Sequence, residues 1–157
     1  MESIIYFYRE MIHQNLDKER KIVVLGPYWS VYNNLSLKGL RRGDNMLMKY
    51  MTGDRPDDFP MKWDEVERIF LPFYLPDERK QHWVALEIDL IQWAILIYDS
   101  NVGLYTDEVL KERLQLVIEG FPKCIRRYEP LAYKFADKLD QELIVLRRDN
   151  IKQNNQG

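Results

Sequence analysis

The 157-residue sequence contains one cysteine, Cys124, and two histidines, His13 and His82. A single cysteine excludes a disulfide within the chain and favours a reducing environment, so we expect an intracellular protein, nuclear or cytoplasmic. Zinc sites need three or four ligands at recognisable spacings. Two histidines and one distant cysteine do not provide such a spacing, so no metal site is expected.

Glycine-rich motifs, excess charge and long apolar runs are also missing. The seven glycines are scattered, and none forms a phosphate-binding fingerprint before a helix, so no cofactor is expected. The 23 basic and 25 acidic side chains nearly cancel, which leaves no electrostatic footprint for nucleic acid. The longest unbroken apolar stretch, Trp93 to Tyr98, is far too short to span a bilayer, so no membrane partner is expected.

What the sequence does contain is enough apolar material for one folded domain over residues 1–157. Hydrophobic residues make up 46% of the chain. Apolar periodicity predicts helices over residues 1–16, 106–121 (with Thr106 as N-cap and a stop at Pro122) and 130–139, and strands over 21–25, 66–72 and 142–148. Residues 26–61 show a mixed pattern that places no element. A run of strands flanked by helices predicts an α+β fold.

Residues 82–100, HWVALEIDLIQWAILIYDS, predict a β-hairpin with a histidine and an aspartate at its open end. A turn centred between Leu90 and Ile91 would place Ile88 opposite Trp93 and His82 opposite Asp99. Opposed residues share a face and lie about 4.5–5.5 Å apart at Cβ, so an imidazole N–H could donate to the carboxylate. The pair would be two-thirds of a catalytic triad. The alternative, that both are strand-end residues in contact with water, stays open.

The missing third member is a nucleophile, and Cys124 is the only thiol available. Neighbouring Arg126 and Arg127 could lower its pKa, but nothing else around it indicates a site. We therefore interpret Cys124 as a small buried or half-buried residue. The amide-rich end of the chain, residues 152–157, could donate hydrogen bonds to an oxyanion, although its composition alone favours a frayed terminus.

The run His82-Trp83-Val84, the block Tyr98-Asp99-Ser100 and the terminal QNNQG of residues 153–157 together resemble the C-terminal catalytic domain of the ubiquitin-like protease family, from about Trp63 onward. These are SUMO-type cysteine proteases, including many plant members associated with transposons. The resemblance implies a papain-like cysteine protease fold, with a central mixed sheet flanked by helices and incomplete at the C-terminus. It also implies cleavage after the C-terminal Gly-Gly of a ubiquitin-like modifier.

Residue by residue, His82 resembles the family's catalytic histidine, Asp99 its orienting aspartate and Gln153 its oxyanion-hole glutamine. Trp83 resembles a tryptophan that lies along the channel for the Gly-Gly tail of the substrate. In the family the nucleophilic cysteine follows the glutamine by six positions, which falls two residues beyond Gly157. We therefore expect this chain to lack its nucleophile and to be inactive alone.

The resemblance has two further consequences. The family's helix after the cysteine would cover the sheet face that carries the apolar side chains of the hairpin, so we expect that face to be under-covered here: Val84, Leu86, Ile95 and Ile97. The early Asn-Asp step of better-studied members is not evident, so the modifier is not indicated. Two other interpretations stay open, namely an inactive remnant that is inert or only binds a ubiquitin-like protein, and a generic α+β interaction domain with accidental His–Asp pairing.

Overall fold

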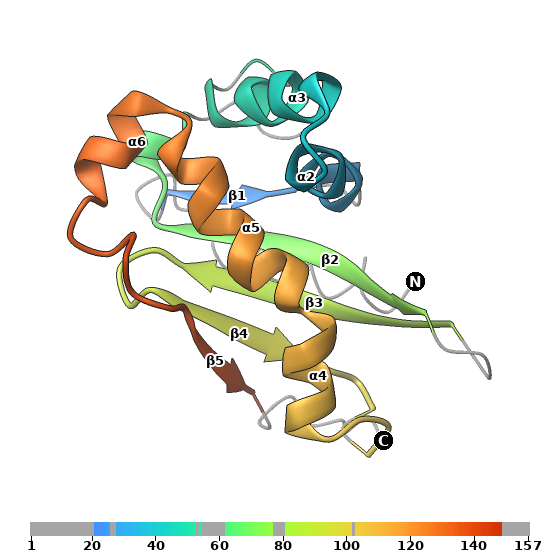
Figure 1. The fold of residues 1–157 in the computed structure, drawn as a ribbon. Coiled ribbons are helices and arrows are strands. Elements are labelled where there is room, and N and C mark those ends of the chain that lie inside the picture. Colours follow the sequence, from blue (N-terminus) through green and yellow to red (C-terminus); the bar gives the residue numbers. More distant parts are fainter. Residues whose placement is uncertain are drawn as a thin grey trace.

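The computed structural model describes residues 21–25, 28–52, 54, 62–76, 81–101 and 103–148. The helix expected over residues 1–16, with His13, lies outside these residues. The described elements follow one another in the order β1 Ile22–Val24, α2 Tyr28–Leu37, α3 Arg41–Thr52, η3 Trp63–Glu65, β2 Arg68–Pro76, β3 Gln81–Asp89, β4 Ala94–Tyr98, α4 Asp107–Arg113, α5 Gln115–Arg126, α6 Glu129–Lys134 and β5 Ile144–Arg147 (Figure 1).

The strands form one mixed sheet in the order β1-β2-β3-β4-β5. The central strands β2, β3 and β4 are antiparallel, whereas β1 pairs with β2 and β5 pairs with β4 in parallel. The strands predicted over residues 21–25, 66–72 and 142–148 are all present, the second extended to Pro76. A mixed sheet packed against helices confirms the predicted α+β class.

The β3–β4 hairpin differs in register from the prediction. Asp89 pairs with Ala94, and Ile88 faces Ile95 rather than Trp93. The turn is longer because the Asp89 carboxylate accepts hydrogen bonds from the backbone N–H groups of Ile91 (2.9 Å) and Gln92 (3.0 Å). The register therefore shifts by two residues. An even shift keeps every side chain on its predicted face, because faces alternate with period two.

The helices also depart from the predicted boundaries. Pro122 does not end a helix but lies inside α5, and the segment after it forms the short α6 rather than a helix to Leu139. A proline inside a helix removes one hydrogen bond. Burial of the apolar side of α5, including Val117, Phe121 and Ile125, offsets that loss. The segment that showed no clear pattern contributes α2 and α3.

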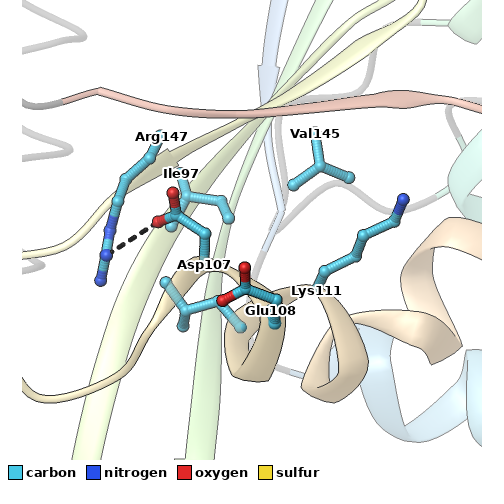
Figure 2. A pocket seen from close by; sticks show the side chains of 7 residues that line it. Ile97, Asp107, Glu108, Lys111, Val145 and Arg147 are labelled. Atoms are coloured by element: carbon cyan, nitrogen blue, oxygen red, sulfur yellow. Dashed lines mark hydrogen bonds and ion pairs between the residues drawn. The ribbon is translucent and has the colours of Figure 1, made fainter.

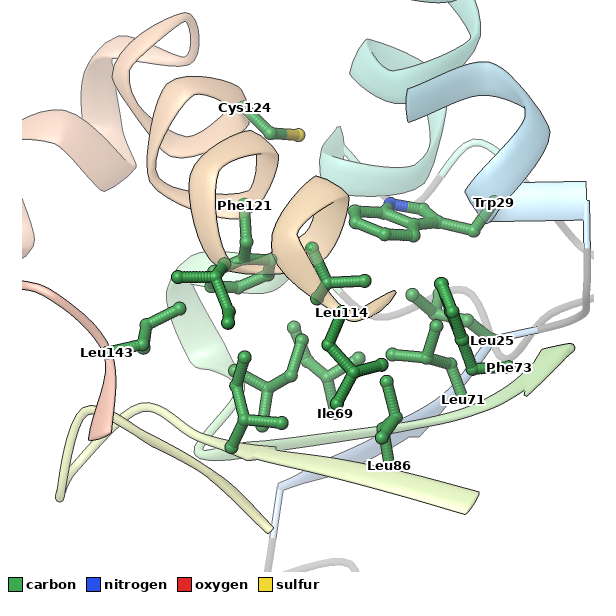
Figure 3. Close-up of a cluster of buried hydrophobic side chains, with 14 of the residues drawn as sticks. Leu25, Trp29, Ile69, Leu71, Phe73, Leu86, Leu114, Phe121, Cys124 and Leu143 are labelled. Atoms are coloured by element: carbon green, nitrogen blue, oxygen red, sulfur yellow. The ribbon is translucent and has the colours of Figure 1, made fainter. Parts of the chain in front are cut away.

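The principal core lies between the sheet and its helices, and α5 runs across the face of the sheet (Figure 1). Apolar side chains from β2 and β3, such as Leu71 and Leu86, point towards Phe121 of α5 and Trp29 of α2 (Figure 3). The face expected to be under-covered is in fact buried: Val84 is 0%, Leu86 0%, Ile95 0% and Ile97 2% exposed. That expectation was wrong because α4 and α5 themselves supply the cover.

Helices α2 and α5 approach closely where Asn33 meets Gly120. The buried Asn33 side chain donates from Nδ2 to the Leu116 carbonyl of α5, at 3.1 Å. A Cβ at position 120 would lie 2.6 Å from both amide heteroatoms of Asn33. Glycine at 120 thus makes room for a buried inter-helix hydrogen bond.

We expect Gly120→Ala to destabilise the fold by about 1–3 kcal/mol, because the Asn33 amide must move off its acceptor or strain against the new methyl group. Urea unfolding followed by circular dichroism measures the change. Gly103→Ala is the matched control, since a Cβ there meets only the Asn101 side chain at 4.0 Å. Equal stability of the two variants would contradict the steric account.

Candidate active site

His82 and Asp99 meet at the open end of the hairpin. His82 lies in β3 paired with the fully buried Leu75 of β2, which places its side chain on the core face of the sheet. Asp99 follows the last residue of β4. His82 Nε2 lies 2.7 Å from Asp99 Oδ1, and the side chains are 11% and 0% exposed. The two are diagonal rather than directly opposed, because extending the observed register would place Asn101 across from His82.

The Asp99 carboxylate accepts three hydrogen bonds. Oδ1 accepts from His82 and from the backbone N–H of Asn101 at 2.9 Å, and Oδ2 accepts from Arg147 Nη2 at 3.1 Å. A buried carboxylate is costly unless it is paired and hydrogen-bonded. Arg147 supplies the compensating charge from the neighbouring strand β5.

This arrangement fixes the role of each imidazole nitrogen of His82. A carboxylate only accepts hydrogen bonds, so Nε2 carries the hydrogen that Asp99 receives. In the neutral ring Nδ1 then holds the lone pair. The site can therefore take a proton at Nδ1 and stabilise the resulting imidazolium through Asp99.

Arg147 is a site residue that the sequence interpretation missed. Its Nη2 also donates to the Tyr105 carbonyl at 3.0 Å, and its Nη1 donates to Asp107 Oδ1 at 3.0 Å. It borders a pocket of about 260 Å3 between β5 and α4, shown in Figure 2. The sequence did contain a signal for an inward-facing Arg147. Side chains alternate along β5, so Arg147 lies on the same inward face as Val145.

The side chains of Trp83 and His82 lie on opposite faces of the sheet. Adjacent residues of a strand point to opposite faces, and Trp83 packs with Phe70 and Ala85 on the face away from the principal core. The centroid of its ring lies 5.1 Å from the ring centroid of Tyr74, its cross-strand partner. Tyr74 is 37% exposed. The role expected for Trp83 stays a prediction. Gln153 lies outside the described residues, so its oxyanion role also stays a prediction.

Cys124 is a buried core residue, as predicted. It is 1% exposed, and its Sγ lies 3.6 Å from Met51 Sδ, between α5 and α3. Burial raises the pKa of the Cys124 thiol to about 12, against a smaller lowering by Arg127. A neutral, inaccessible thiol is a poor nucleophile, so Cys124 is not the partner of His82.

We expect Cys124 to resist alkylation by iodoacetamide at pH 8 in the folded chain and to react rapidly in guanidinium. Between pH 9 and about 12 the unfolded chain releases the thiol proton while the folded chain keeps it. Stability should therefore fall as the pH rises through this range, and less steeply in Cys124→Ala. Rapid labelling of the native protein, measured by mass spectrometry, would contradict the burial.

Within the portion of the chain that the structure describes, no helix is both long and apolar enough to cross a membrane. The same portion holds no group of three or more His, Cys, Asp or Glu side chains placed to bind a metal. The site geometry consists of one imidazole, one carboxylate and one guanidinium.

Comparison with known proteins bears on the family and the fold of this chain. A search of curated protein sequences returned no match. Among solved structures the fold is similar to that of a SUMO protease Ulp1 with its catalytic cysteine oxidised to a sulfinic acid, at a TM-score of 0.51 and 19% identity, covering 94% of this chain and 55% of that one. It is also similar to the C-terminal Ulp1 protease domain in complex with Smt3, the yeast ortholog of SUMO, at a TM-score of 0.52 and 18% identity, covering 94% and 54%.

The TM-scores over 94% of this chain indicate a shared fold, so the sheet and helices described above are the papain-like arrangement expected from the sequence. The chain spans about half the length of the two solved structures. Residues 2–156 match the family described as the Ulp1 protease family, C-terminal catalytic domain. The match extends over nearly the whole sequence, and the chain belongs to the Ulp1 protease family.

Proposed function

We propose that this chain supplies the acid–base half of a cysteine peptidase site that cleaves a ubiquitin-like modifier after its C-terminal Gly-Gly. The observation that carries the proposal is the 2.7 Å contact between His82 Nε2 and Asp99 Oδ1 on a buried carboxylate. It leaves Nδ1 as the proton acceptor. Family membership supports the reaction class.

In the proposed reaction, a thiol beside His82 Nδ1 loses its proton to the imidazole, and the thiolate attacks the carbonyl carbon of the terminal glycine. The imidazolium returns the proton to the leaving amine as the peptide bond breaks. Water then hydrolyses the thioester with His82 again as base. Asp99 holds the ring and stabilises its charged form, and Gln153 would donate its amide to the oxyanion.

The nucleophile in this proposal is a thiol other than Cys124, the single cysteine of the 157 residues. Burial of Cys124 in the α3–α5 contact and its raised pKa both argue against it. The 157-residue chain alone is therefore proposed to bind its modifier without cleaving it.

The modifier class rests on the similarity to a protease domain solved with Smt3, the yeast ortholog of SUMO. Trp83 and Tyr74 form a half-exposed aromatic pair at the end of the sheet where His82 lies. We propose that this pair contacts the Gly-Gly tail. We further propose a nuclear or cytoplasmic location, where such modifiers act and where a lone thiol stays reduced.

Cleavage is tested with the full product of the gene and with SUMO-like, ubiquitin and other modifier precursors that carry a reporter after Gly-Gly. We expect release of the reporter from at least one precursor. His82→Ala should lower kcat/KM by at least about 1,000-fold, because the general base is lost. Cys124→Ala is the matched control and should stay within about two-fold. Cleavage that needs Cys124 and not His82 would overturn the proposal.

Binding is tested with the 157-residue chain by tryptophan fluorescence. Trp29, Trp63 and Trp93 are buried, so Trp83 is the only tryptophan that a partner can reach directly. We expect a modifier to shift the emission of the chain, and Trp83→Phe to abolish that shift. Calorimetry with the same modifiers detects binding that leaves Trp83 untouched. If no modifier binds by either method, the inert interpretation replaces this one.

A further inference from the structure

We propose that Arg147 is a positioning residue of the site: by binding Asp99 Oδ2 it turns Oδ1 towards His82 and so fixes the orientation of the imidazole. The catalytic meaning of this inference rests on the proposed function. The positioning itself is a property of the 157-residue chain and can be measured without any reaction.

Strand pairing brings Arg147 to the site. In the parallel β4–β5 ladder Arg147 is the partner of Ile97, and the next backbone N–H, that of Arg148, donates to the Ile97 carbonyl at 2.8 Å. Asp99 lies two residues after Ile97, just past the end of β4, within reach of a long side chain that points inward. The Arg147 side chain is only 14% exposed.

The guanidinium is held on both of its terminal nitrogens. Nη2 donates to Asp99 Oδ2 (3.1 Å) and to the Tyr105 carbonyl (3.0 Å), while Nη1 donates to Asp107 Oδ1 (3.0 Å). A planar guanidinium fixed in this way presents a rigid donor to Oδ2. With Oδ2 occupied, the carboxylate cannot rotate freely, and Oδ1 stays directed at His82 and at the Asn101 N–H.

Charge gives Arg147 a second effect on the same carboxylate. Asp99 is 0% exposed, so water does not compensate its charge. Among the residues that the structure describes, Arg147 is the one cationic side chain within ion-pair distance of Asp99, apart from an imidazolium at His82. A neutral side chain at position 147 would remove one donor and the compensating charge from Asp99. The hydrogen bond between Asp99 and His82 would then be less well ordered.

Asp107 offers a matched control. Its carboxylate contacts the outer edge of the same guanidinium but is 79% exposed and does not touch Asp99. Asp107→Asn therefore changes the surroundings of Arg147 without removing the donor to Asp99. Arg147→Lys keeps the positive charge but loses the paired terminal nitrogens of the guanidinium, whereas Arg147→Met loses both.

The experiment measures solvent exchange of the His82 Nε2 proton by 1H–15N NMR in the 157-residue chain. Only two histidines are present, so His13→Gln leaves His82 as the single imidazole signal. We expect a downfield, protected Nε2 proton in the parent chain and in Asp107→Asn, within two-fold of one another. Exchange should be at least ten-fold faster in Arg147→Met and intermediate in Arg147→Lys.

Backbone amides in the same spectra separate positioning from general support of β5. The Asn101 amide donates to Asp99 and should lose protection together with His82, whereas the Arg148 amide donates to Ile97 and should keep it. Unchanged His82 exchange in Arg147→Met overturns the inference. Loss of protection at the Arg148 amide together with His82 also overturns it, because Arg147 would then only stabilise the pairing of β5. Failure to cleave any modifier would count against the proposed function and not against this result.

Discussion

The antiparallel pairing of β3 with β4 is the constraint on which the rest of this structure depends. It decides which side chains face the helices, and the turn that closes it is set by the Asp89 carboxylate on two backbone N–H groups. Because side chains alternate with period two, one pairing puts Val84, Leu86 and Ile88 into the core and His82 at its rim. Core and site are thus two parts of a single strand face.

The sequence predicted this face correctly and the register incorrectly, and the reason is physical. Alternation reports only whether a residue points in or out, so a shift of two residues leaves the pattern unchanged. The extra length of the turn depends on side-chain hydrogen bonds of Asp89 that composition does not reveal. Diagonal placement still lets His82 reach Asp99, so the expected contact is present with a different pairing.

Other features needed the tertiary structure. Proline usually ends a helix, so the sequence predicts a stop at Pro122. In the structure, burial of α5 against the sheet offsets the hydrogen bond that Pro122 cannot form. Helix α2 carries no clear stripe because it packs against both α3 and α5. Helix α3 does bury one side, and the sequence interpretation missed its spacing: Gly43, Leu47, Tyr50 and Met51. Arg147 lies 48 residues from Asp99, and no local pattern connects a basic residue near the end of one strand to a carboxylate that follows another strand.

The opposite face of the sheet carries a polar contact of a different kind. Glu87 is 4% exposed, and its carboxylate accepts from the Tyr98 hydroxyl at 3.1 Å and pairs with Arg68 at 3.6 Å. Burial raises the pKa of Glu87 and, together with that carboxylate, raises the pKa of Tyr98 to about 12. Tyr98 is the last residue of β4 and Asp99 follows it, so consecutive residues serve two separate polar clusters.

The donors to Asp99 come from three places: β3, the turn after β4, and β5. The first two are close to Asp99 in the chain, but the third requires the parallel pairing of β5 with β4, and the helices α4, α5 and α6 lie between these strands in the sequence. Pairing of segments far apart in the chain carries a larger entropic cost of loop closure than pairing within a hairpin. The complete set of donors to Asp99 is therefore present only where β5 is paired with β4, and the order of the imidazole depends on the contact that is most distant in the sequence.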